Sequence, residues 1–217
     1  MPAPGRRLRG KVLFRAAALA ALLASAGDLL MLLVANGHAP PWGSIGSYIL
    51  AIGGILGVVT IPVYYIGYQA AASLLGLSPL RRRLCLFGAA LVALFGAVTH
   101  ALTALDIQAA RVAGRDARPP AEAFTDPANP LFLAALIAAA GALIAVACLI
   151  TAGFRSHANA IRQAILFNPI VATVILGAGA AVSQWTMAYI APSAPNLAHV
   201  LFFALLARAS GLQAKRT

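Results

Sequence analysis

Long apolar runs separated by short polar segments constrain most strongly how this chain of 217 residues folds. A helix needs about 20 mainly apolar residues to cross a bilayer, and in lipid only helices and closed barrels satisfy every backbone polar group. The alternation typical of barrel strands is absent, and only 10% of the residues are charged. The sequence therefore predicts an all-α, polytopic membrane helix bundle that forms a single integral membrane domain over residues 1–217.

We expect about six transmembrane helices in this domain. Their predicted ranges are 15–36, 45–75, 84–108, 130–153, 164–191 and 195–212. The second range is longer than a bilayer requires, and Pro62 near its middle lacks an amide hydrogen, which favours a kink. In the sixth range the unbroken apolar stretch is short, from Val200 to Ala207.

Basic residues are distributed unevenly among the segments that flank these ranges. Of the 16 Lys and Arg residues, all but three lie near the chain ends, between the second and third ranges, or between the fourth and fifth. The other three, Arg111, Arg115 and Arg118, lie between the third and fourth ranges. The same segment holds three acidic residues, Asp116, Glu122 and Asp126. Since cytoplasmic loops carry the excess of Lys and Arg, we expect a multi-pass protein of the cell membrane with both termini in the cytoplasm. Basic residues sorted in this way form no patch for nucleic acid, so no nucleic-acid partner is expected despite a net charge of +11.

The first range also has features of a signal peptide. Basic residues precede an apolar run, and Ala24-Ser25-Ala26 resembles a cleavage site for small residues. Arg15 interrupts this pattern, and the apolar run continues from Leu29 to Val34. We therefore expect an uncleaved first helix.

Polar residues inside the predicted helices are the candidates for function, because such groups are costly in lipid and normally face a bundle interior or a cavity. They come from four helices and are expected at comparable depth, in the half of the membrane away from the termini: Asp28, His100, Thr103, Asp106, Gln184, Trp185, Asn196 and His199. Two Asp and two His within one group predict a lined cavity with a substrate or proton site. The alternative is that these groups only form hydrogen bonds between helices.

Aromatic residues on the second range extend the set of candidates. Tyr64 and Tyr68 lie one helical turn apart, and such residues usually pack or anchor a helix at the membrane interface. If they face a cavity instead, their π-faces can stabilise a cation. We group them with Thr103, Gln184, Trp185 and Asn196 as candidate substrate-binding residues. No metal-binding motif such as HExxH occurs, so neither a metal nor a cofactor is expected.

Two functions of different classes fit these residues, together with a non-catalytic accessory subunit. The first is an intramembrane enzyme that acts on a lipophilic small molecule, with Asp28 or Asp106 as general acid and His100 or His199 exchanging the proton. The second is a transporter or channel for protons or cations. The lack of an internal repeat and the scarcity of polar residues in the cytoplasmic halves of the helices argue against the second function.

A chain of this size with several spans, intramembrane acids on separate helices and no cofactor motif resembles the small bacterial integral-membrane terpene cyclases of indole and diketopiperazine terpenoid pathways. The resemblance covers the architecture of the whole chain, and Asp28 and Asp106 match only as carboxyls of the required kind. The scarcity of intramembrane Glu departs from the related fungal cyclases. The resemblance implies proton-initiated cyclisation of a terminal alkene or epoxide on an isoprenoid-type molecule, without a metal.

Overall fold

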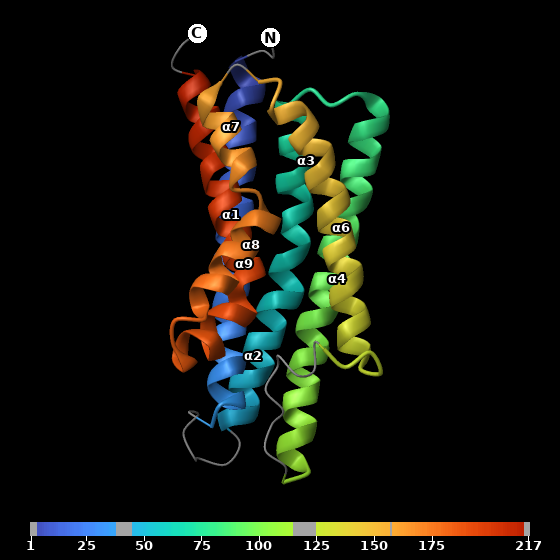
Figure 1. The fold of residues 1–217 in the computed structure, drawn as a ribbon, viewed down its shortest axis with the longest axis vertical. Coiled ribbons are helices and arrows are strands. Elements are labelled where there is room, and N and C mark those ends of the chain that lie inside the picture. The colour runs from blue at the N-terminus through green and yellow to red at the C-terminus, as the bar shows by residue number, and fades with distance from the viewer. Residues whose placement is uncertain (1–3, 38–44, 115–124, 157, 215–217) are drawn as a thin grey trace.

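The computed structural model describes residues 4–37, 45–114, 125–156 and 158–214. Within these residues the chain contains helices and no strand, and the helices lie side by side along one long axis (Figure 1). This arrangement confirms the predicted all-α helix bundle. The helices are α1 (Pro4–Ala35), α2 (Ile45–Thr60), the 3-10 helix η1 (Ile61–Val63), α3 (Tyr64–Leu74), α4 (Pro79–Val112), α6 (Pro130–Gly153), α7 (Asn159–Leu166), α8 (Pro169–Ala180) and α9 (Gln184–Ala214).

Several of these helices are long and apolar enough to cross a membrane. Five such spans occur in the described residues: Gly10–Ala35, Ile45–Leu74, Pro79–Val112, Pro130–Gly153 and Gln184–Gly211. The bent pair formed by α7 and α8 makes a sixth if it counts as one span. The protein is therefore a multi-pass membrane protein by the length and composition of its helices.

Both termini lie at the same end of the bundle, as Figure 1 shows. The α3–α4 connection and the α6–α7 connection lie at this end too, which we call the terminal end. At the opposite, distal end α1 and α4 end and α2 and α6 begin. The assignment of the terminal end to the cytoplasm stays a prediction from the distribution of charge.

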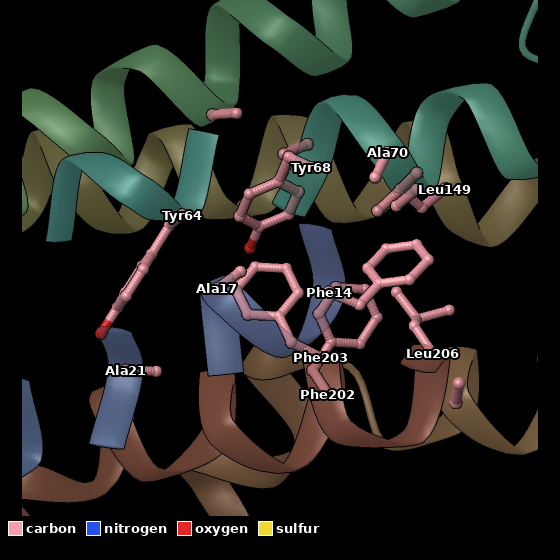
Figure 2. Packing of buried hydrophobic residues seen from close by; sticks show 14 of the residues in the cluster. Phe14, Ala17, Ala21, Tyr64, Tyr68, Ala70, Leu149, Phe202, Phe203 and Leu206 are labelled. Atoms are coloured by element: carbon pink, nitrogen blue, oxygen red, sulfur yellow. The ribbon is translucent and has the colours of Figure 1, made fainter. Parts of the chain in front are cut away.

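The second span is interrupted at Pro62, as the sequence predicts. The α-helical geometry ends at Thr60, and residues Ile61–Val63 form one 3-10 turn before α3 begins at Tyr64. Proline supplies no amide hydrogen to the preceding turn, which is why the regular bonding pattern fails here. Directly after the turn, the side chains of Tyr64 and Tyr68 point towards α1 and α9 (Figure 2).

The prediction of one continuous helix over 164–191 is wrong. A break at Phe167 and Asn168 separates α7 from α8, and the two helices are bent by 54°. Asn168 caps α8, because its Oδ1 accepts hydrogen bonds from the amides of Ile170 and Val171 at 3.0 and 3.2 Å. Pro169 at the first helical position begins α8 favourably and ends any helix that precedes it.

The boundary predicted between 191 and 195 is also wrong, because α9 begins at Gln184 and continues through Pro192 and Pro195. The helix starts at a reciprocal cap, in which the Thr186 amide donates to Ser183 Oγ and the Ser183 amide donates to Thr186 Oγ1. Prolines in a helix interior normally disrupt it. Here α9 packs along α1, and buried Ala194 and Ala198 maintain the helix where local preference is weak.

Aromatic side chains fill the terminal half of the bundle. Phe14 of α1, Tyr68 of α3, and Phe202 and Phe203 of α9 are fully buried and pack together (Figure 2). The ring centroids of Tyr68 and Phe203 lie 5.6 Å apart in an edge-to-face arrangement. Gly67 permits this packing, since a Cβ there would meet the Phe203 ring at 2.5 Å. The terminal half is therefore tightly packed around these rings.

Candidate functional site

A cavity of about 390 Å³ lies inside the bundle, between α1, α4, α6, α8 and α9. Most of its wall is apolar and small, and α6 contributes a stripe of alanines: Ala135, Ala138, Ala139 and Ala142. Polar side chains from α1, α3, α4 and α9 also line it: Asp28, Tyr64, Thr99, His100, Thr103, Asn196 and His199. The structure thus brings together, around one cavity, polar residues that lie far apart in the sequence.

Asp28, His100 and Asn196 form a compact hydrogen-bonded group that joins α1, α4 and α9. The Asp28 Oδ1 lies 3.1 Å from His100 Nε2, and the Asn196 Nδ2 donates to Asp28 Oδ2 at 2.8 Å. Asn196 Nδ2 also lies 3.1 Å from His100 Nε2. The side chains of Asp28 and His100 are only 13% and 6% exposed, so this group is largely shielded from its surroundings.

Tyr64 fixes the orientation of the Asn196 amide. Its hydroxyl donates to Asn196 Oδ1 at 2.8 Å, which leaves the amide nitrogen directed at the carboxyl of Asp28. A reversed amide would place two oxygens against each other at Asp28. The tyrosine therefore holds the donor of Asn196 against the acid.

One proton can lie on either side of the contact between Asp28 and His100. With a hydrogen on Nε2 the imidazole donates to the carboxylate, and without it Nε2 accepts from the protonated acid. The proton can pass between the two groups without movement of a heavy atom, because the contact is already within hydrogen-bond distance. Asp28 and His100 are therefore placed to exchange a proton at the cavity wall.

The other ring nitrogen of His100 lies against α2. His100 Nδ1 is buried and has no hydrogen-bond partner in the described residues. Gly57 provides the space for the ring, since a Cβ at this position would overlap the imidazole. Gly53, one turn earlier, packs against the backbone of Gly27 on α1. The sequence pattern Gly53-xxx-Gly57 thus serves packing within the chain.

His199 has a different arrangement, in which both ring nitrogens are occupied. Its Nδ1 lies 2.7 Å from the carbonyl oxygen of Pro195, and its Nε2 lies 3.0 Å from the hydroxyl of Tyr68. A carbonyl only accepts, so Nδ1 carries the hydrogen and Nε2 accepts from Tyr68 in a neutral ring. The ring also stacks on Tyr64 at a centroid distance of 4.6 Å. This geometry supports a positioning role for His199 rather than proton transfer.

Other predicted site residues lie away from the cavity. Asp106 is half-buried on α4 and does not line it, because six residues at 100° each turn its side chain about 120° away from His100. Gln184 and Trp185 are exposed at the start of α9, about 18 Å along the helix from Asn196. Tyr68 reaches the site only through His199.

The sequence matches the model of a family of unknown function, DUF6796, over residues 6–211. The chain belongs to this family. No curated protein matches the sequence, and no solved structure matches it. The range that the family model matches includes every residue that lines the cavity.

Sequence reasoning missed the apolar residues that shape the cavity of this DUF6796 chain. Leu143 of α6 and Val174 of α8 line it although they are 57% and 64% exposed, and exposed Ala139 lies beside them. A residue that both lines a cavity and faces outwards marks its mouth. The mouth therefore lies between α6 and α8, near the middle of both helices. The alanine stripe on α6 was visible in the sequence, but alanine is so abundant here that the pattern did not stand out.

In the described residues, no group of three or more His, Cys, Asp or Glu side chains is arranged to hold a metal ion. The cavity wall offers a carboxyl, an imidazole and an amide in mutual contact, together with a phenol that donates to the amide.

Proposed function

We propose that this protein is an intramembrane enzyme that acts on a lipophilic small molecule by acid/base chemistry. The observation that carries the proposal is the contact of Asp28 with His100 at the wall of an otherwise mainly apolar cavity. Placing an ionisable pair inside a membrane helix bundle costs free energy, and such pairs usually have a function.

The position of the mouth supports a lipophilic substrate. Leu143 and Val174 flank the opening between α6 and α8, at a level where a membrane protein faces hydrocarbon. A molecule dissolved in the bilayer can enter there without crossing a polar interface. A volume of about 390 Å³ falls in the range of pockets that bind small molecules, about 300–1,000 Å³.

The reaction class that we propose is proton-initiated cyclisation of an isoprenoid-type chain. Asp28 would donate its proton to a terminal alkene or epoxide, and the neutral His100 imidazole would then take up a proton from solvent and pass it to the Asp28 carboxylate. Asn196 would hold the carboxyl in place through its bond to Oδ2. A base must finally remove a proton from the cyclised cation when no water is added, so an alkene substrate gives a product of unchanged mass.

Isotope labelling tests this proposal. The purified protein in proteoliposomes would be incubated in D₂O with a prenylated indole that carries a terminal alkene. We expect a cyclised isomer in which the initiating step adds one deuterium to carbon, and no product from Asp28→Asn. Product formed without deuterium on carbon would exclude initiation by a solvent-exchangeable acid.

Coupled transport of protons or cations is the second candidate, and the break between α7 and α8 favours it. Transporters often bind their substrates at discontinuous helices, and α8 lines the cavity directly after such a break. The packed aromatic side chains of the terminal half argue against a continuous path. A flux of protons or cations in proteoliposomes that Asp28→Asn abolishes would favour transport over catalysis.

We also propose that the protein resides in the cell membrane with its terminal end in the cytoplasm. The support is the concentration of Lys and Arg at that end.

A further inference from the structure

A second cavity, of about 380 Å³, lies at the terminal end of the bundle. It is bounded by the connection between α3 and α4 and by the turn between α6 and α7: Leu74, Leu75, Gly76, Leu77, Ser78, Arg81, Ala152, Arg155, Ser156 and Ile161. It shares no residue with the site around Asp28. Nothing in the proposed acid/base chemistry requires it.

Two arginines, Arg81 and Arg155, line this cavity. Arg81 lies on the first turn of α4 and Arg155 lies just after α6. The chain has only five acidic residues. Of the three that the structure describes, Asp28 and Asp106 lie within α1 and α4, and Asp126 lies just before α6. No Asp or Glu of the described residues lines the cavity, so its two arginines give it a net positive lining that suits an anion.

The backbone around the cavity adds to its preference for an anion. Ser78 precedes α4 but makes no side-chain capping bond; Pro79 has no amide hydrogen and the Arg82 amide bonds to the Ser78 carbonyl, so the amides of Leu80 and Arg81 are the ones that no side-chain cap occupies. Across the cavity, the Arg162 Nε donates to the carbonyl oxygen of Ser156 at 2.7 Å and thereby fixes the turn that carries Arg155. Arg81 thus borders the cavity from the start of α4, and Arg155 borders it from the end of α6.

We propose that this cavity binds the phosphate group of an anionic phospholipid. The transmembrane helices α3 and α6 end at Leu74 and Gly153, so the cavity lies at the level where hydrocarbon gives way to headgroups. Leucine side chains beside the arginines suit the glycerol and upper acyl region of a lipid better than a free, fully hydrated phosphate. Basic pockets between transmembrane helices on the cytoplasmic side recognise headgroups in this way.

Lipid retention measured by native mass spectrometry tests the proposal on the full chain in detergent. The protein would be delipidated and offered phosphatidylglycerol or phosphatidylcholine with the same acyl chains. We expect preferential retention of phosphatidylglycerol, reduced about fivefold by Arg81→Gln or by Arg155→Gln, since one basic residue near lipid phosphate contributes about that factor. Arg83→Gln is the matched control, because Arg83 is exposed on the same helix and does not line the cavity.

The design separates this site from general surface charge and from a site for free phosphate. An equal loss in Arg83→Gln would overturn the proposal in favour of non-specific attraction. Displacement of phosphatidylglycerol by millimolar inorganic phosphate would overturn the lipid as the source of the anion. Arg155 is exposed at a turn, so Arg155→Gln keeps the test decisive even if Arg81→Gln fails to fold. An unchanged lipid preference in Arg155→Gln would refute the proposed site.

Discussion

Replacing Asp28 by Asn removes the transferable proton from the site and changes little else. The two side chains have nearly the same volume, and the amide oxygen of an asparagine can still accept the hydrogen bond from Asn196 Nδ2. His100 Nε2 also keeps a hydrogen-bonding partner, because the asparagine places an amide atom where Asp28 Oδ1 lies 3.1 Å from it. The variant therefore isolates the acidity of residue 28 from its packing.

The expected loss of activity far exceeds the expected loss of stability. General acid catalysis by a positioned side chain contributes about 10²–10⁴ to a rate, so turnover should fall by at least about a hundredfold. One altered hydrogen bond within a bundle changes the free energy of unfolding by about 1 kcal/mol. The variant should therefore fold and lose its activity.

Asp106→Asn is the matched control, because it makes the same chemical change on a helix of the same bundle. Asp106 does not line the cavity, so we expect activity within about twofold of wild type. The assay would measure conversion of a prenylated aromatic substrate by chromatography and mass spectrometry. Thermal unfolding in detergent would be recorded for each variant to compare their stability.

Two results would refute the reasoning. Wild-type turnover in Asp28→Asn would exclude the Asp28 carboxyl as the acid, whatever the cavity binds. An equal loss in Asp28→Asn and Asp106→Asn, with both proteins folded, would show that position at the cavity wall does not decide which carboxyl matters.

Further predictions concern packing, access and topology. Gly57→Ala should displace the His100 ring and lower the free energy of unfolding by about 1–3 kcal/mol, whereas Gly177→Ala, with no atom within 4 Å of the added Cβ, should be neutral in the same thermal unfolding assay. Val174→Trp should obstruct the mouth and lower kcat/KM for a bulky substrate, and Ile175→Trp on the outer face of α8 should not. Asn168→Ala should lower stability by about 1 kcal/mol through loss of the α8 cap, with recovery in Asn168→Ser. Cysteine labelling in intact cells should find residues 81–83 protected from a membrane-impermeant reagent, and ready labelling there would reverse the topology.

Hydrophobicity was sufficient to predict the first four helical ranges and their order. The range predicted as 130–153 coincides with α6, and the interruption at Pro62 lies where the missing amide hydrogen placed it. Depth in the membrane follows from position along a span, so residues such as Asp28, His100 and Asn196 could be grouped before any contact was known. Depth does not reveal which face of its helix a side chain occupies. For that reason we grouped Asp106 with the residues of the cavity, although it does not line the cavity.

The sequence rules failed in the region of α7, α8 and α9, where local signals compete. Pro192 and Pro195 favoured a boundary, yet the reciprocal cap at Ser183 and Thr186 begins the last helix well before them. Burial of α9 against α1 outweighs the preference of two prolines, and a sequence alone does not reveal that packing.

The same region gives the cavity its opening. Asn168 and Pro169 end α7 and start α8 at an angle of 54°, and α8 then packs on α9 while it contacts α6 at few positions. The mouth between Leu143 and Val174 lies where those contacts are few. A helix that continued straight from α7, as the sequence rules predicted, would not follow the course that α8 takes along α9. The Asn-Pro pair thus sets the course of the helix that borders the opening, and a local departure from regular structure of this kind is what we expect beside a site such as the one proposed around Asp28 and His100.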